Sequence, residues 1–427
     1  MNRPYHALRH PEFRRLWVTQ LVSLTGSQMQ VVALNWHVYL LTHSALALGF
    51  VGLTRVIPIV LFSLGGGVVA DRRDRRHVMI VAQAAMAVIS VALASLAVQR
   101  RESVAALYAL NALQAAASAF DNPARQALVP RLVPSADLPG ALALNLTMFH
   151  AAMIGGPALG GLVLAGTGLS GWSETSRLGL LYGLNAASFL GVIATLLAMK
   201  TSGAPEPSPE GREALLEALR SGLRFVFTTP IMVSTMALDF FATFFSGSMS
   251  LLPIVADQVL GVGASGYGWL VAAPAVGAVL GSLYTSVRPL PRRQGRVLLW
   301  AIVGYGVATI VYGLSRSYPL TLVALAATGL ADVVSTVIRQ TIRQLLTPDA
   351  MRGRMTSVNM IFFLGGPQLG ELEAGLVAHL FVSAAVGVTV SVVSGGLLTL
   401  AAVAVVAVRA PHVRNYERPG GMSYSAS

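Results

Sequence analysis

Long apolar runs separated by short bursts of arginine most constrain how this chain can fold. Twelve such runs follow one another, each near the roughly 20 residues with which an α-helix crosses a bilayer. Of the 427 residues, 54% are hydrophobic and 11% charged, whereas soluble domains carry about 25% charged residues. The chain is therefore expected to be an all-α polytopic membrane protein.

The apolar runs predict one membrane-spanning helix each. The ranges are 14–40, 46–70, 77–98, 103–126, 138–166 and 177–199 in the first half, and 226–255, 264–287, 297–315, 318–340, 354–380 and 383–408 in the second. Residues 200–225 are expected to form a cytoplasmic linker, Pro- and Ser-rich at first and then an amphipathic helix. The expected domains are six-helix bundles at 1–199 and 226–409, with a cytoplasmic tail at 410–427.

The basic residues predict the orientation in the membrane. With both termini in the cytoplasm, 25 of the 30 Lys and Arg residues fall on inner loops, linker and tails, and four on outer loops. This asymmetry fits the positive-inside rule and predicts a bacterial-type inner-membrane protein. The net charge of +12 therefore orients the chain and does not indicate nucleic-acid binding, which needs clustered exposed cations. The absence of cysteine excludes disulfides, thiolate metal sites and a cysteine nucleophile.

Two sequence matches indicate an internal repeat. Arg125-Gln126 recurs as Arg339-Gln340, and Gly155-Gly-Pro157-Ala-Leu-Gly160 recurs as Gly365-Gly-Pro367-Gln-Leu-Gly370. Chance similarity between Gly- and Ala-rich helices is the alternative. A repeat of six spans predicts two similar bundles that face each other across a central path, a known plan of transporters.

The loop between spans two and three carries the first family motif. It reads Gly67-Val-Val-Ala-Asp71-Arg72-Arg73-Asp74-Arg75-Arg76. This loop resembles the G-x-x-x-D-R-x-G-R-R loop of major facilitator superfamily transporters, with Asp74 replacing the second glycine as in the enterobactin-exporter-like and macrolide-efflux-like branch. Its carboxylate and arginines could latch neighbouring helix ends in one conformation and release them in another. The alternative is that the arginines only follow the positive-inside rule. That alternative explains the charge but not the presence of Gly67 and Asp71.

Span five carries a second motif. Gly156-Pro157-Ala-Leu-Gly160-Gly161 is similar to the G-P-x-x-G-G core that marks exporters and antiporters of this superfamily. Glycines allow close helix packing and proline bends a helix; ordinary small-residue packing is the alternative. The resemblance covers nearly the whole chain. It implies the major facilitator fold, with twelve transmembrane helices in two six-helix pseudo-repeats.

Ionisable residues inside predicted spans are costly and indicate function. Asp239 and Asp332, on spans seven and ten, are the proton-coupling candidates; each could instead cap polar groups of a neighbouring helix. The family architecture implies that span two packs near span eleven, which predicts an inter-bundle pair between Arg55 and Glu371 or Glu373. That pair could set the inward/outward equilibrium or be static.

Polar and aromatic residues on spans one, four and seven predict the substrate cavity, because the resemblance implies that these spans line it. The candidates are Gln28, Asn35, Trp36, His37, Asn111, Gln114, Phe120, Phe240 and Phe244. Some phenylalanines of span seven must face lipid. The scattered histidines predict no metal site, and no motif predicts a cofactor.

These features predict a monomeric secondary transporter that exports an amphipathic small molecule, siderophore or drug-like, by proton antiport with alternating access. No nucleotide-binding motif indicates ATP as the direct drive. Three alternatives stay open: a proton-coupled importer of the same fold, a membrane-embedded enzyme such as a lipid acyltransferase, and a sensor that does not transport. The enzyme would need a histidine–acid pair that the sequence does not show, so no catalytic residue is predicted.

Overall fold

The computed structural model describes residues 4–101, 103–166, 168–169, 171–204, 223–287, 292–348 and 352–417. Within these ranges the regular secondary structure is helical, without strands. The chain divides into two compact units, the first made of Met1–Pro209 and Met249–Ala272, the second of Glu210–Ser248 and Ala273–Ser427. Most of the expected amphipathic linker helix falls on residues 205–222, outside the described residues.

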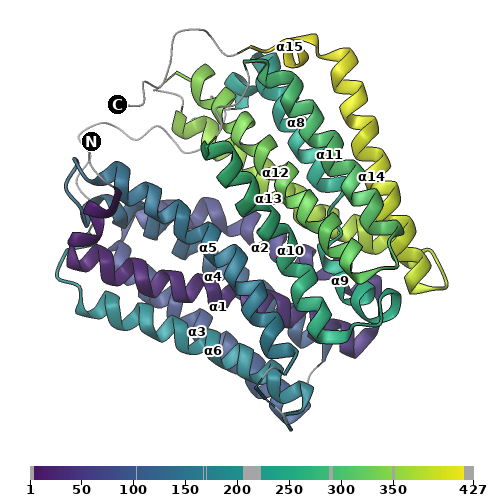
Figure 1. Ribbon diagram of the computed structural model, residues 1–427. Coiled ribbons are helices and arrows are strands. Elements are labelled where there is room, and N and C mark those ends of the chain that lie inside the picture. The colour runs from purple at the N-terminus through teal and green to yellow at the C-terminus, as the bar shows by residue number, and fades with distance from the viewer. Residues whose placement is uncertain are drawn as a thin grey trace. The chain divides into compact units, whose positions relative to one another are not determined.

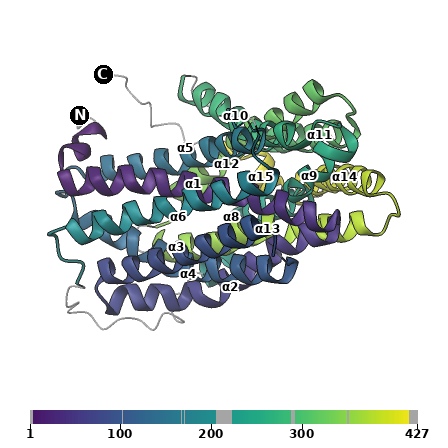
Figure 2. The same ribbon diagram turned by 90° about the horizontal axis from the view of Figure 1, so that it is seen from below.

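The first unit contains six long helices. They are α1 (Pro11–Thr42), α2 (Ala45–Arg72), α3 (Arg75–Gln99), α4 (Val104–Leu128), α5 (Leu138–Leu164) and α6 (Glu174–Ala198). Short 3-10 turns, η1 (Pro4–Arg9) and η2 (Val129–Arg131), precede α1 and follow α4. Helix α1 packs against both α5 and α6, while α3 packs along α6 and against α4 (Figures 1 and 2).

Helix starts in both units follow from polar capping residues. The side chains of Ser44, Ser103, Ser173 and Ser383 each accept a hydrogen bond from the backbone N–H three residues later. Such caps satisfy N–H groups that a first helical turn leaves without a partner. The serines therefore separate apolar runs that would otherwise read as continuous.

Buried amides and hydroxyls fasten the first unit internally. Gln30 Oε1 of α1 accepts hydrogen bonds from Ser90 Oγ of α3 and Asn185 Nδ2 of α6, both at 2.8 Å. Gly26 lies against Asn185, where an added Cβ would stand 2.8 Å from its Oδ1. Interhelical hydrogen bonds and small residues are the usual means of association where lipid removes the hydrophobic driving force.

The second unit contains five long helices. They are α8 (Pro230–Phe245), α11 (Gln294–Leu314), α12 (Tyr318–Leu346), α13 (Arg352–His379) and α14 (Ala384–Arg409), with the short α15 (Pro411–Arg414) after them. Helix α11 packs against α12 and α14, and α13 packs against α8 and α14. Helix α10 (Gly263–Val287) begins in the first unit and continues in the second. Figure 1 shows α14 running beside α11.

The predicted seventh span, 226–255, is wrong as a continuous helix. Helix α8 ends at Phe245, and the chain resumes after Ser248 as η3 (Met249–Leu251), α9 (Leu252–Ile254) and the π-turn η4 (Val255–Val259). Gly247 lies against the backbone of Gly370, so a Cβ there would stand 2.7 Å from its carbonyl carbon. Pro253 lacks the N–H that would continue an α-helix. Small residues and a proline therefore interrupt the helix, although Pro230–Val259 as a whole is still long and apolar enough to cross a membrane.

Nine helical segments among the described residues are long and apolar enough to cross a membrane. Three further helices, α1, α4 and α13, have 32, 25 and 28 residues. They fall outside the nine. Each of the three carries several polar or ionised side chains within its length, which lowers its apolar content.

Candidate functional site

A buried ion pair joins α8 to α12 in the second unit. The guanidinium Nη2 of Arg339 lies 2.7 Å from Oδ1 of Asp239, and the two residues are 3% and 6% exposed. Leu238 and Ala242 of α8 and Ile338 and Ile342 of α12 belong to one buried apolar cluster around this pair. Apolar packing therefore brings the charges together, and their pairing offsets part of the cost of desolvation.

Arg339 also holds the second predicted acid. Its Nη2 lies 3.6 Å from Oδ1 of Asp332, whose side chain is 49% exposed. Its Nη1 donates to Ser335 Oγ at 2.6 Å and its Nη2 to Thr336 Oγ1 at 2.9 Å. One guanidinium thus connects both proton-coupling candidates, a shared partner that the sequence does not predict.

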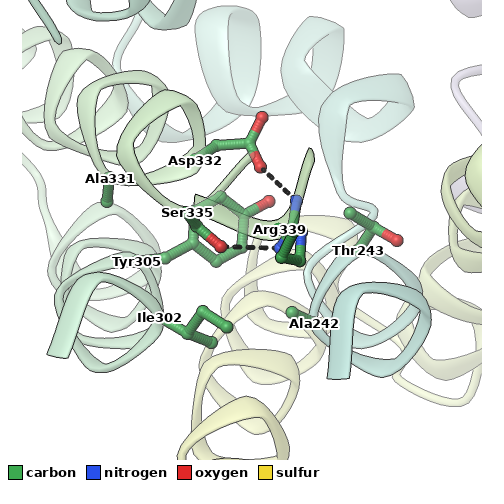
Figure 3. Close-up of a pocket in the computed structure, with 8 residues that line it drawn as sticks. All are labelled: Ala242, Thr243, Ile302, Tyr305, Ala331, Asp332, Ser335 and Arg339. Carbon is green, nitrogen blue, oxygen red and sulfur yellow. Dashed lines mark hydrogen bonds and ion pairs between the residues drawn. The ribbon is translucent and has the colours of Figure 1, made fainter. Parts of the chain in front are cut away.

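A small cavity adjoins this acid–arginine cluster of Asp239, Asp332 and Arg339. Its volume is about 10 Å³, at the lower limit for a single water molecule. Figure 3 shows Asp332 and Ser335 of α12 pointing toward Arg339, with the ring of Tyr305 from α11 beside them. Ala242 and Thr243 of α8 line the cavity from the other side. Carboxylate, guanidinium and hydroxyl groups therefore meet around one small space.

The sequence predicts neither Tyr305 nor Arg339 as a site residue. In the sequence, the charges of Arg339 and Arg343 are counted only among the basic residues of the inner side, whereas both residues lie in α12 and are 3% and 5% exposed. The helix extends to Leu346, and Asp239 supplies the partner with which Arg339 stays buried. Tyr305 has only a weak local signal, because its helix also contains Thr309 and Tyr312.

The described part of the arginine motif holds helix ends of the first unit. Arg75 Nη1 donates to Ala127 O of α4 at 3.1 Å, and Arg76 Nη1 to Met199 O, directly after α6, at 2.6 Å. Asp74 accepts from the N–H groups of Arg76 and His77 at 2.8 and 3.3 Å and so caps α3. Its φ of −59° requires no glycine. Arg72 is exposed, and the side chains at positions 67 and 71 lie outside the described part.

The chain that follows α6 is tied to the same end of the first unit. Glu12 accepts the N–H of Lys200 at 2.7 Å and the N–H of Thr201 at 3.3 Å, together with the Thr201 hydroxyl. Arg75 N donates to Gly203 O at 3.0 Å. Burial acts to raise the pKa of Glu12, but the hydrogen bonds from Thr201 and Lys200 outweigh it and hold that pKa below its usual value. The first linker residues are therefore part of this unit.

The antiporter-like motif provides close helix contacts. A Cβ on Gly156 would overlap Gln28 of α1, and one on Gly160 would stand 3.3 Å from Met29 Cα. Gly161 meets Gly268 of α10 backbone to backbone, so neither position has room for a side chain. Pro157 lies within α5. The glycines of the motif therefore lie at close helix contacts, as either interpretation of the motif would have it, and an antiporter role stays a prediction.

The segment Met249–Ala272, here called the outer hairpin, packs on α1 of the same unit. Tyr39 donates its hydroxyl to Asp257 and accepts from Gln258 Nε2 at 3.2 Å. Trp36 stacks on Tyr267 with ring centroids 5.1 Å apart, and Tyr267 donates to Val32 O at 3.3 Å. Tyr39, Asp257 and Tyr267 are not among the predicted site residues.

The cavity candidates of the first unit fall into two groups. Several are engaged within the bundle: Trp36 donates to Glu174 at 2.6 Å, His37 pairs with Tyr182 at 3.1 Å, and Asn111 donates to Thr54 Oγ1 at 2.8 Å. Gln28 is half-buried and donates to Met153. Asn35 and Gln114 each retain a buried side-chain oxygen without a hydrogen-bond partner. Phe120 packs against Phe62 with ring centroids 6.1 Å apart.

In the second unit, Phe240 and Phe244 stack with ring centroids 5.7 Å apart. Arg55 lies on α2 of the first unit, and Glu371 and Glu373 on α13 of the second. Their pairing and the cavity roles stay predictions.

The described residues form helices, nine of their segments are long and apolar enough to cross a membrane, and charged groups lie buried between the helices, which is typical of a polytopic membrane protein. The sequence model of the transmembrane secretion effector family matches residues 2–420. The chain belongs to this family, which is part of the major facilitator superfamily. The family consists of transporters and not enzymes.

Relatives with known names share most of the chain. The enterobactin exporter EntS of Shigella boydii serotype 18 is 30% identical over 367 residues, which cover 86% of this chain and 85% of the relative. EntS of Escherichia coli O1:K1 is 29% identical over the same lengths.

Solved structures show the same fold. A bacterial homologue of the human lysosomal transporter Spinster, inward-facing and unoccupied, has a TM-score of 0.74 at 16% identity and covers 96% of this chain and 99% of its own. The nucleoside transporter NupG has a TM-score of 0.66 at 13% identity, with coverages of 94% and 98%. The expected major facilitator fold is thus confirmed at the level of an all-helical membrane transporter.

Proposed function

We propose that this chain is a proton-coupled secondary transporter that exports an amphipathic small molecule from the cytoplasm. The observation that carries the proposal is the acid–arginine cluster, in which Arg339 holds Asp239 and Asp332 beside a small cavity. A proton on Asp239 would cancel its attraction for Arg339. Binding and release of that proton can therefore alternate with two arrangements of α8 and α12.

Twelve spans in two pseudo-repeats are part of the proposal. Helices α1, α4 and α13 would join the nine apolar segments found among the described residues. Two matched contacts support the repeat: Gly156 of α5 packs on α1, and Gly366 of α13 packs on α8 beside Phe240 and Thr243. Gly160 and Gly370 repeat the relationship against Met29 and Phe244. The recurring sequence thus makes the same kind of helix contact in each unit.

Alternating access is supported by the outer hairpin. It packs on α1 through Tyr39 and Tyr267, although the chain on both sides of it belongs to the second unit. Its connections pass through Gly247 and Pro274, where α8 has ended and α10 contains a proline. In this proposal the hairpin separates from α1 when the transporter changes state, and the chain bends at these two points.

The substrate class and direction come from the relatives. They are named enterobactin exporters, which supports export of a siderophore or a molecule of similar amphipathic character. Positive-inside charge supports cytoplasmic termini, a cytoplasmic linker at 200–225 between bundles at 1–199 and 226–409, and a tail at 410–427, in the inner membrane. The protein is proposed to act as a monomer with protons, substrate and bilayer as its partners.

The test is flux in proteoliposomes with an imposed pH gradient and a panel of siderophores and amphipathic drugs. Wild type should accumulate a substrate on the side from which protons leave, and Asp239→Asn should lose the gradient dependence. Glu417→Gln is the matched control, because Glu417 pairs with Arg293 while both side chains are at least 60% exposed. Undiminished gradient-driven flux in Asp239→Asn would contradict the coupling role. Flux in the same direction as proton flow would make the chain an importer.

A further inference from the structure

A buried carboxylate in the first unit has no place in the proposed coupling site. Asp121 of α4 is 6% exposed. Its Oδ1 accepts a hydrogen bond from Gln83 Nε2 of α3 at 2.9 Å, and its Oδ2 lies 3.8 Å from Nε of Arg125. The sequence patterns do not single out this aspartate, because it lies four residues before an arginine that reads as an inner-face charge.

The charge of Asp121 is compensated more weakly than that of Asp239. Arg339 reaches Asp239 at 2.7 Å, whereas Arg125 directs its Nη2 to Asn122 Oδ1 at 2.7 Å and keeps only the longer contact with Asp121. One neutral amide and one distant guanidinium are poor compensation for a buried carboxylate. Protonation would remove the uncompensated charge.

Gln83 can form a hydrogen bond with Asp121 in either of its two states, the carboxylate or the carboxylic acid. It is 1% exposed, and its Oε1 has no hydrogen-bond partner. With the amide as placed, its N–H group donates to the carboxylate. Turned by half a rotation, its C=O group would accept a hydrogen bond from a protonated Asp121. A buried amide oxygen without a partner is costly, and this second arrangement would satisfy it.

The surroundings contain few other charges. Among the described side chains, Arg125 is the charged group that acts on Asp121. On α3, Gln83 faces it, while Arg75 and Arg76 are directed to backbone carbonyls at the ends of α4 and α6. Neither α1 nor α2 contributes a described charged group that acts on it, and the side chain of Asp71 on α2 lies outside the described part.

We propose that Asp121 is a second proton-binding site of this chain, with Gln83 stabilising both the carboxylate and the carboxylic acid. Binding takes one proton from water onto a carboxylate oxygen and breaks no other covalent bond. It weakens the hold on Arg125, which lies one turn further along α4. Each unit would then contain a buried, proton-binding aspartate in contact with an arginine. The arginine is Arg125 in the first unit and Arg339 in the second.

Infrared difference spectroscopy of the full chain in lipid, titrated toward acid, tests the proposal directly. Wild type should gain a carboxylic-acid C=O band that is lost in Asp121→Asn. The band should move to higher frequency in Gln83→Met, because the acid loses its hydrogen-bond partner. Asp137→Asn is the control: Asp137 also belongs to the first unit but pairs with His10 at 2.9 Å outside the long helices, and its loss should leave the band in place.

Two results would overturn the proposal. One is a spectrum of Asp121→Asn identical to wild type at every pH at which the protein stays folded. The other applies if Asp121→Asn does not fold: an unmoved set of carboxyl bands in Gln83→Met. Failure of gradient-driven transport would contradict the proposed function and leave this band unaffected, so the two failures are distinguishable.

Discussion

The guanidinium of Arg339 on α12 and the carboxylate of Asp239 on α8 meet at 2.7 Å, and neither residue is more than 6% exposed. Neither residue could remain at its depth in the unit as a lone charge, because a buried ion without a partner is strongly destabilising. The pair is therefore both a structural contact and a place where one proton can change the packing of α8 on α12.

Removal of Arg339 should destabilise the second unit more than removal of both partners. Arg339→Leu removes the close partner of the buried Asp239 and leaves only the coulombic attraction of Arg343, so the cost is expected to approach the roughly 3–5 kcal/mol of a broken buried pair. The double variant with Asp239→Asn should recover a large part of that loss. Thermal unfolding of the purified protein in one detergent measures the cycle.

The matched control for Arg339→Leu is Arg293→Leu. Arg293 forms an exposed pair with Glu417 at 3.4 Å, and exposed pairs contribute up to about 1 kcal/mol. Equal losses from the two single variants would contradict the special role of burial.

The contact between Gly161 and Gly268 predicts a sharp steric effect. Gly161→Ala should cost about 1–3 kcal/mol, because the added methyl group would overlap the backbone of α10. Gly155→Ala, in the same helix, should be neutral or slightly stabilising, since nothing lies within 4 Å of its added Cβ. The measurement is the unfolding temperature of each variant. Similar values would show that the contact between α5 and α10 tolerates a methyl group, which would contradict the prediction.

Tyr39→Phe should loosen the outer hairpin. The chain has no cysteine, so Ser250→Cys introduces a single thiol at a hairpin position that is 0% exposed. Loss of a hydrogen bond to a carboxylate should raise the rate of thiol labelling roughly tenfold. Tyr108→Phe is the control, because the Tyr108 hydroxyl donates to Ala47 O within the helices of the first unit. Equal labelling in both would contradict a gating contact at Tyr39.

Glu12 predicts a pH dependence of stability. Because its folded pKa is lowered from 4.5, the ionised form is favoured by folding, and its contribution is present above pH 4.5 and is lost as the pH falls through the lower folded value. Glu12→Gln should therefore lower the stability at neutral pH by at most about 1 kcal/mol, because solvent screens part of the interaction of this largely solvated carboxylate. The gap between the variant and wild type should close in acid, as followed by unfolding from neutral pH to below 4.5.

Most helices could be predicted from the sequence because the bilayer requires long apolar runs with charge between them. The predicted 46–70 and 383–408 differ by only a few residues from α2 and α14. The break after Phe245 could not be predicted from hydropathy, because Gly247 is nearly neutral on such a scale and matters only where Gly370 approaches it.

The candidate site was predictable only in part. Asp239 and Asp332 stand out as acids in apolar runs, so sequence alone could nominate them. Arg339 lies near the end of its run and looks like an ordinary inner-face charge in the sequence. Its role becomes visible only when the structure places Asp239, from a distant part of the chain, beside it. Gln83 and Asp121 show the same limit, since a pairing between helices is invisible in either helix alone.

The outer hairpin belongs to the second half of the sequence but packs as part of the first structural unit. A chimera that joins residues up to the linker with the remainder of a relative would set a foreign hairpin on α1, with its own residues opposite Tyr39 and Gly161. Exchange of residues 249–272 together with the first half would keep those surfaces matched. Chimeras of such transporters are therefore expected to fold most often when the chain is exchanged at three points, after the linker and at both ends of the hairpin, and not at the linker alone.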